Sequence, residues 1–173
     1  MELIRLIPEM DIKPFDCGDA DLNGFLFDDA KNYGSSLLAV TYLIQDDENT
    51  IAYFAYQNDK ISHTDIGGGN LKKFIKRVGS LLPKEKGEFK SYPAVKIGRL
   101  GVNNDFKGKG IGKQIIQFTI QYFTENNKTG CKFITVDAYK ASLKFYEKMG
   151  FKYLSSADEK SDTRLMYFNL VSV

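Results

Sequence analysis

The pattern of hydrophobic and polar positions predicts a mixed chain of strands and helices. Two runs rich in β-branched and aromatic residues, Ser36–Asp46 and Asn49–Asp59, flank a short acidic turn and predict a hairpin. The strand pattern returns over Ala94–Val102 and Lys132–Tyr139, and between these the segment Lys113–Asn127 repeats its apolar positions at helical spacing. This order predicts a mixed α/β sheet with helices packed on its faces.

The remaining expected elements are shorter. A helix is expected over Asp19–Gly34, where Asp19 or Asp21 can cap the first turn and Gly34 ends it. We expect a flexible connector at Thr64–Asn70, which holds three consecutive glycines. The other expected elements are strands at Glu2–Ile7, Phe151–Ser156 and Thr163–Leu170, and helices at Leu71–Leu82 and Lys140–Gly150.

Length and composition favour a single domain over residues 1–173. A chain of this size buries roughly two-thirds of the surface that its unfolded form exposes. A hydrophobic content of 43%, with 13 Phe and 10 Tyr, is typical of a packed core. The formal charge of +2 is too small to indicate nucleic-acid binding by itself.

The chemistry of the rare residues is limited. Cys17 and Cys131 form neither a disulfide framework nor a metal-ligand spacing, so we expect reduced thiols and no metal. The only histidine, His63, lies beside the expected connector and is expected to be solvated. The N-terminus is charged throughout and has no long apolar stretch, so we expect no signal peptide. No apolar run approaches the about 18 residues of a membrane span, so we expect no membrane association. The expected reduced thiols indicate a cytoplasmic location.

A glycine–lysine loop follows the strand Ala94–Val102. Residues Lys107–Lys113 read Lys-Gly-Lys-Gly-Ile-Gly-Lys and open a helix, an arrangement typical of phosphate binding. The Walker loop does not fit, because position 107 is not Gly and Gln114 stands where that motif needs Ser or Thr. The dinucleotide fingerprint does not fit either, because the spacing is G-x-G-x-G. A glycine-rich turn can also be only a tight connection, although the flanking lysines favour anion binding.

The loop resembles the pyrophosphate loop of the GNAT superfamily of acetyl-CoA-dependent N-acetyltransferases, which carry Arg/Gln-x-x-Gly-x-Gly/Ala before a helix. Lys107 departs from that pattern, and we expect the change to be tolerated because such a loop binds through backbone N–H groups. Downstream, Ser142–Phe151 resembles the family segment A-x-x-x-Y-x-x-x-G-F, with Tyr146 as its tyrosine. The family often has Asn or Asp where this chain has Tyr139.

The resemblance implies a GNAT fold, with a mostly antiparallel sheet of six or seven strands splayed around an acetyl-CoA cleft and helices on both faces. It implies direct attack of an amine on the thioester in a ternary complex, with Tyr146 as the acid for the CoA thiolate. A phenol with a pKa of about 10 can protonate or hydrogen-bond a thiolate whose parent pKa is about 8.5. Tyr146 can also be a packing residue with its hydroxyl in water. The implied acetyl-CoA contacts are Leu100, Gly101 and Val102 beside the pantetheine arm and Lys107, Gly108, Lys109, Gly110, Ile111, Gly112 and Lys113 at the diphosphate.

The segment Phe15–Ala30 resembles the F-x-C-G-x-x-x-L-N-x-F-L segment of the GNAT toxins of bacterial toxin–antitoxin systems. Those enzymes acetylate the α-amine of aminoacyl-tRNA, so the resemblance implies this acceptor and a small antitoxin as a partner. An α-amine has a pKa of about 8 and is partly neutral near neutral pH, so it needs little help from a base. The sequence identifies no general base.

The segment Leu71–Lys90 could follow an RNA backbone, because it holds seven basic residues against two acids, a net charge of +5. Such a run is also common on a solvated helix face. The alternatives are an acetyltransferase of a small-molecule amine, protein N-terminus or lysine, and a catalytically degenerate acetyl-CoA-binding module. A monomer or a homodimer is expected. The seven basic residues are Lys72, Lys73, Lys76, Arg77, Lys84, Lys86 and Lys90.

Overall fold

The computed structural model describes residues 1–67, 71–78, 90–125 and 129–172 of the chain. Its strands are β1 (Glu2–Arg5), β2 (Val40–Gln45), β3 (Thr50–Ser62), β4 (Ser91–Val102), β5 (Phe133–Tyr139), β6 (Lys152–Tyr153) and β7 (Thr163–Asn169). Its α-helices are α1 (Ala20–Gly24), α2 (Ala30–Ser35), α3 (His63–Ile66), α4 (Leu71–Val78), α5 (Ile111–Thr124) and α6 (Leu143–Lys148). A π-helical segment, η1 (Phe25–Asp29), joins α1 to α2, and short 3₁₀ turns occur at η3 (Asn104–Phe106), η4 (Lys140–Ser142) and η5 (Leu170–Ser172).

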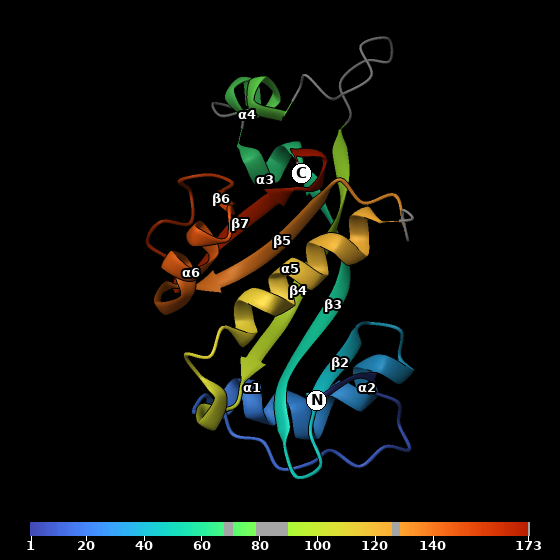
Figure 1. The fold of residues 1–173 in the computed structure, drawn as a ribbon. Helices are drawn as coiled ribbons and strands as arrows, with labels where there is room; N and C mark the ends of the chain where they lie inside the picture. Colours follow the sequence, from blue (N-terminus) through green and yellow to red (C-terminus); the bar gives the residue numbers. More distant parts are fainter. Residues whose placement is uncertain (68–70, 79–89, 126–128, 173) are drawn as a thin grey trace. The chain divides into compact units, whose positions relative to one another are not determined.

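The strands form one seven-stranded sheet in the order β1-β2-β3-β4-β5-β7-β6 (Figure 1). The pairs β1–β2, β2–β3, β5–β7 and β6–β7 are antiparallel, whereas β4 and β5 are parallel and are connected through α5. Parallel neighbours need such a crossover, because a tight turn can join only antiparallel strands. The predicted sheet of six or seven mostly antiparallel strands is confirmed.

Contacts along the chain define two compact units, of which the first comprises residues 1–58 and 97–119 and the second residues 59–96 and 120–173. Each unit has its own hydrophobic cluster of buried side chains. β3, β4 and α5 each contribute residues to both units. The single domain over residues 1–173 stays a prediction.

The first unit is organised around Tyr53 of β3. Its ring lies edge-on to Phe15 at 5.4 Å and stacks on Phe25 at 6.2 Å between centroids. Its hydroxyl donates a hydrogen bond of 2.7 Å to the carbonyl oxygen of Leu22. This buried tyrosine therefore holds α1 and η1 against β3, with its polar atom satisfied by the helix backbone.

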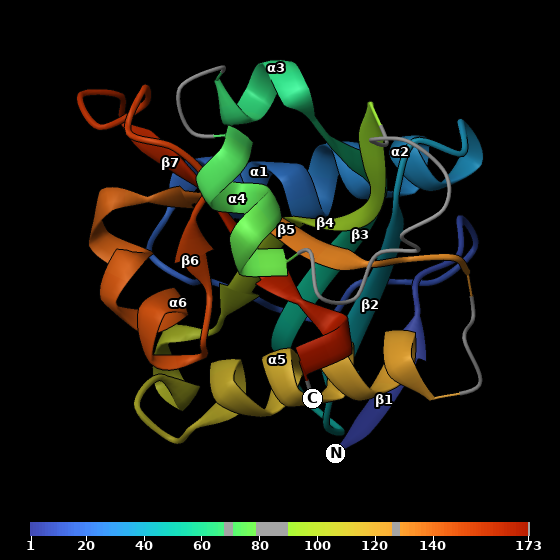
Figure 2. The ribbon, with the colours of Figure 1, turned by 90° about the horizontal axis from the view of Figure 1, so that it is seen from above.

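In the second unit, Phe74 of α4 is buried against the rings of Tyr92, Phe133 and Tyr167, at centroid distances of 6.1, 5.8 and 5.4 Å. Helix α4 lies beside α3, as Figure 2 shows. Because one face of α4 is buried, its lysines occupy the opposite, solvent-facing side.

Most of the expected elements are confirmed, with one correction. The expected connector at Thr64–Asn70 is wrong in its first part, because Thr64–Ile66 belong to α3, while residues 68–70 lie outside the described part. Ser62 caps this helix in a capping box with Asp65, which satisfies the first backbone N–H groups. His63 is the first residue of this helix. Its Nε2 is buried with no hydrogen-bond partner among the described residues, so the expected solvation of this histidine is wrong for that atom.

Helix α2 ends in an unusual turn, and this generates a prediction. Leu37 is the only non-glycine residue with a positive φ, +57°, in the described part of the chain, and its side chain is 90% exposed. The Leu37 N–H donates to Gly34 and the Leu38 N–H donates to Tyr33, which gives the αL helix ending that normally uses glycine.

We predict that Leu37→Gly raises the free energy of unfolding by about 0.5–1 kcal/mol, because glycine adopts this conformation without strain and the lost side chain packs on little. Urea denaturation measures the change. Leu38→Gly is the control, because Leu38 is also exposed but lacks a positive φ, so glycine there should be destabilising. Equal stability of the two variants would contradict the prediction.

Candidate functional site

Strand β4 ends in a segment whose backbone is only partly used by its neighbour. The parallel register of β4 with β5 covers Ala94–Lys96, which lie opposite Phe133–Thr135. The rest of the strand, Ile97–Val102, extends beyond this register. Backbone N–H and C=O groups of a strand segment outside its register with a neighbour can pair with an extended ligand.

Gly101 allows β4 to lie close to the core of the first unit. A Cβ atom at this position would lie 2.8 Å from Tyr53 Cε1 and 3.0 Å from Phe15 Cζ. Those distances are too short for real contacts, and both rings are buried. Glycine is thus required here by packing, which the sequence pattern alone does not indicate.

The predicted loop lies between β4 and α5, beside α1 (Figure 1). Gly108 and Gly110 have φ angles of +76° and +80°, and the space where a Cβ would stand is open at both. Alternation of left- and right-handed residues turns successive backbone N–H groups toward a common point, which is the geometry of an anion-binding nest. Helix α5 begins at Ile111, and the first N–H groups of a helix have no partner within it. The loop and helix end together offer N–H groups and a positive dipole to an anion.

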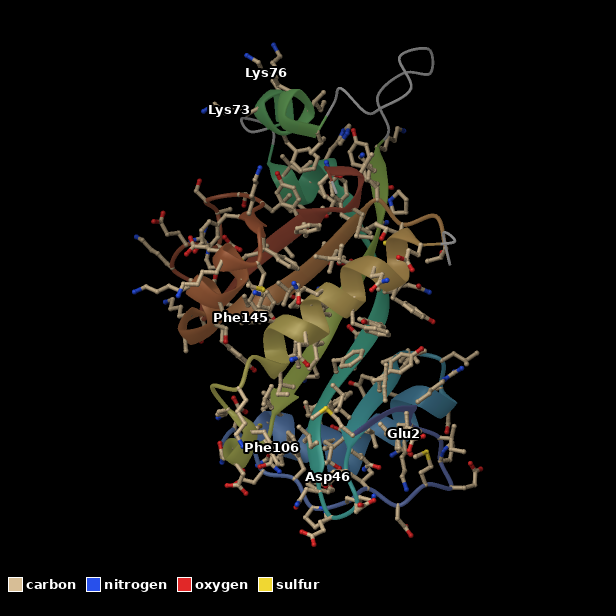
Figure 3. The ribbon with its side chains drawn as sticks, in the orientation of Figure 1. Glu2, Asp46, Lys73, Lys76, Phe106 and Phe145 are labelled. Carbon is tan, nitrogen blue, oxygen red and sulfur yellow. The ribbon has the colours of Figure 1, made fainter. Side chains whose placement is uncertain are left out.

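The three lysines of the loop have different environments. Lys107 donates a hydrogen bond of 2.6 Å from Nζ to the carbonyl oxygen of Cys17, so its ammonium is held by the protein. The Lys109 ammonium lies 4.7 Å from the ring centroid of Phe106, a residue labelled in Figure 3. Lys113 is exposed on the first turn of α5. Lys107 thus fixes the start of the loop to the backbone at Cys17.

Tyr146 belongs to the second unit, on α6, and is only 6% exposed. Its ring packs edge-on against Phe145 and Phe151, at centroid distances of 5.0 and 5.3 Å. Burial raises the pKa of the Tyr146 phenol above its ordinary value of 10.0. The phenol is therefore neutral at physiological pH, and its hydroxyl donates no hydrogen bond to any residue that the structure describes. Tyr146 suits a hydrogen-bond donor or acid better than a base.

The cysteines have the character of structural thiols. Cys17 is buried, and burial raises its pKa. Burial also raises the pKa of Cys131, to about 11. Both thiols are thus protonated near neutral pH and poorly nucleophilic. Among the described residues, no group of three or more His, Cys, Asp or Glu side chains could hold a metal ion.

Comparison with known proteins identifies the family. The family model described as "Acetyltransferase (GNAT) domain" matches residues 78–170, more than half of the chain. The chain belongs to the GNAT acetyltransferases. The matched range includes the end of β4, the glycine loop and Tyr146.

Several solved structures share the fold of this GNAT acetyltransferase over 99% of its length. AtaT complexed with acetyl-methionyl-tRNAfMet has a TM-score of 0.76 at 18% identity, with 95% of that chain covered. AtaTR bound with AcCoA has a TM-score of 0.74 at 19% identity, with 94% covered. A tyrosine-to-phenylalanine mutant of KacT has a TM-score of 0.73 at 18% identity, with 97% covered.

Sequence reasoning missed the contacts that hold the loop of this acetyltransferase. Asn104 hydrogen-bonds to Asp16, and Lys107 of the loop hydrogen-bonds to Cys17. Both contacts join parts of the chain that lie far apart in sequence. The only sequence signal near these residues was the Phe15–Ala30 segment. Its resemblance indicated a subgroup of the family and not a contact with the glycine loop. No helix among the described residues has the length and apolar character needed to cross a membrane.

The packing of Gly101 gives a prediction. Gly101→Ala should lower the free energy of unfolding by about 1–3 kcal/mol, because the new methyl group meets two buried rings that have little room to move. Gly98→Ala is the matched control on the same strand, since its Cβ would meet the end of the flexible Gln57 side chain at 2.9 Å. Urea denaturation of both variants tests this. A Gly98 variant as unstable as the Gly101 variant would count against the steric explanation.

Proposed function

We propose that this GNAT acetyltransferase binds the diphosphate of acetyl-CoA on the backbone of Gly108–Lys113 and transfers the acetyl group to a primary amine. The observation that carries the proposal is the pair of left-handed glycines at the start of α5. An acetyl-CoA complex of a protein with the same fold, AtaTR, supports it. The proposed contacts are Leu100, Gly101 and Val102 for the pantetheine arm and Lys107, Gly108, Lys109, Gly110, Ile111, Gly112 and Lys113 for the diphosphate.

The end of β4 has a role in the proposed reaction. Its backbone N–H groups in Leu100–Val102 can pair with the amides of the pantetheine arm, as a further strand would. One of them can donate to the thioester carbonyl oxygen, which becomes negative as the amine attacks. The N–C bond forms and the C–S bond breaks. The amine loses a proton, and the CoA thiolate gains one.

Tyr146 is the proposed donor to the thiolate. Its raised pKa keeps the proton on the phenol, so Tyr146 suits a hydrogen-bond donor that stabilises the developing thiolate, and it leaves no phenolate near neutral pH to act as a base. Burial keeps both cysteine thiols protonated, so they are poor nucleophiles. This supports direct attack by the amine rather than a route through an acetylated cysteine.

The α-amine of aminoacyl-tRNA is the proposed acceptor. AtaT complexed with acetyl-methionyl-tRNAfMet supports it, because that complex contains the acetylated product of such a reaction. Helix α4 also supports it: Lys72, Lys73 and Lys76 are exposed opposite the buried Phe74, and Figure 3 shows Lys73 and Lys76 projecting outward. Lys90 is exposed as well. Lys84, Lys86 and the Arg77 side chain lie outside the described residues.

Further parts of the proposal concern assembly. A small antitoxin is the proposed protein partner, supported by the structure of an AtaT mutant toxin bound to the C-terminus of the antitoxin AtaR. The chain is proposed to act as a single acetyltransferase domain, as a monomer or a homodimer.

An acceptor panel tests the function. Purified protein and labelled acetyl-CoA are offered charged tRNA, uncharged tRNA, free amino acids, polyamines and peptides. Label on charged tRNA alone is expected. Label on amines, peptide N-termini or lysines but not on charged tRNA would replace the proposed acceptor, and binding of acetyl-CoA without transfer to any acceptor would identify a catalytically degenerate module.

We predict that replacing Lys72, Lys73 and Lys76 by Gln raises KM for charged tRNA about tenfold and reduces its salt dependence, because fewer phosphates are neutralised. Turnover of a free amino acid ester should not change, since it carries no RNA backbone. The test is to measure KM for charged tRNA and for the amino acid ester, each at two salt concentrations. An equal effect on both acceptors would exclude an RNA-binding role for α4.

Tyr146→Phe should lower kcat about 100-fold, because general acid catalysis by one positioned group is worth roughly this much. The KM for acetyl-CoA should change little. Tyr153→Phe is the control: this tyrosine of the same unit has its ring 4.4 Å from the guanidinium of Arg164 and has no proposed role. Unchanged turnover of the Tyr146 variant at every pH tested would remove Tyr146 from the mechanism.

A further inference from the structure

We propose that Asp16 is a positioning residue for acetyl-CoA, because it ties the segment Asp16–Asn23 to the glycine loop and thereby fixes the N–H groups of that loop. The inference rests on the proposed function. It assigns a role to an N-terminal segment that has none in the proposed chemistry.

Asp16 first organises its own segment. Its Oδ1 accepts hydrogen bonds of 2.7 Å from the Gly18 N–H and 2.7 Å from Asn23 Nδ2. The Asn23 side chain in turn accepts from the Cys17 N–H at 3.0 Å. The segment is therefore a closed turn in which one carboxylate and one amide satisfy the backbone.

The same residue reaches the chain just before the loop. The carbonyl oxygen of Asp16 accepts from the Asn104 N–H at 2.8 Å, and its Oδ2 accepts from Asn104 Nδ2 at 3.3 Å. Next to it, the carbonyl oxygen of Cys17 accepts from Lys107 Nζ at 2.6 Å. The loop is thus held at its first residue, Lys107, and three residues earlier, at Asn104.

The fit between segment and loop is close. Gly18 has a φ of +74°, and a Cβ there would lie 3.3 Å from Asn104 Oδ1. The pKa of Asp16 is lowered, chiefly by the hydrogen bond from the Gly18 N–H, then by those from Asn23 and Asn104 and by the charge of Lys107. The carboxylate is therefore ionised near neutral pH and accepts hydrogen bonds from both sides.

The consequence for binding follows from preorganisation. Gly108 and Gly110 both have a positive φ, and glycine has more backbone freedom than any other residue, so contacts from outside the loop help to keep it in one conformation. Fixing the loop before binding reduces the entropy that acetyl-CoA must supply. Loss of the contacts between Asp16 and Asn104 should weaken binding of the diphosphate while leaving the transfer step unchanged.

The experiment compares two donors and two variants. Acetyl-CoA carries the diphosphate, whereas S-acetylpantetheine lacks it and does not use the loop. Asp16→Asn keeps one acceptor oxygen and loses the negative charge. Its NH2 group replaces the second oxygen and cannot accept the hydrogen bond from Asn104 Nδ2. Asp46→Asn is the matched control, since Asp46 accepts from the N–H groups of Glu48 and Asn49 in the β2–β3 turn and also has a lowered pKa.

For Asp16→Asn we expect KM for acetyl-CoA to rise about tenfold with kcat unchanged, and KM for S-acetylpantetheine to stay constant. Asp46→Asn should change neither KM. Hydrogen exchange of residues 104–113, measured without substrate, should become faster in the Asp16 variant and not in the control. Asn104→Ala, which removes one contact and keeps Asp16, should give a smaller rise and replaces Asp16→Asn if that variant does not fold.

The outcomes separate the two proposals. Unchanged exchange and an unchanged KM for acetyl-CoA in Asp16→Asn would overturn the positioning role while the proposed function stands. An equal loss of activity with both donors would also overturn it, because that is the result of a general folding defect. If hydrogen exchange of the loop is faster in Asp16→Asn but the wild-type protein transfers acetyl from neither donor, Asp16 still holds the loop in place. That result would refute the proposed function.

Discussion

A site that binds an anion through backbone N–H groups must keep those groups fixed in direction and free of partners within the protein. These two requirements conflict, because an N–H group without a partner does nothing to hold its own segment in place. In the diphosphate site proposed for this chain, different residues carry the two tasks. Gly108 and Gly110 expose the N–H groups, and contacts outside the glycines, from Asp16 to Asn104 and from Lys107 to Cys17, hold the segment.

The same separation explains the packing behind the site. The end of β4 packs closely on one face. Gly101 lets the strand lie against the rings of Phe15 and Tyr53, and Tyr53 is fixed by its hydrogen bond to the backbone of Leu22. Phe15 directly precedes Asp16, so the residues that support the strand and those that brace the loop belong to one continuous segment.

The parts that could be predicted from the sequence are those that depend on local pattern. The helix expected at Lys113–Asn127 is found as α5, because its apolar repeat and its glycine start are both local signals. The connector expected at Thr64–Asn70 is wrong over Thr64–Ile66, because the glycines that follow outweighed the Ser62–Asp65 capping box, which is visible in the sequence. The braces could not be predicted, since the hydrogen bonds from Asn104 to Asp16 and from Lys107 to Cys17 join residues 88 and 90 positions apart.

The fold of this chain is shared with proteins of low sequence identity. AtaT and KacT share 18% of residues with this chain and match 99% of its length. A backbone site constrains the sequence only where a Cβ would collide or strain the chain, as at Gly101 and Gly108. An acceptor is recognised by side chains instead, and these are free to diverge among proteins that bind the same donor. The loop therefore carries information about the donor alone, and the residues around the acceptor have to be found by comparing substrates.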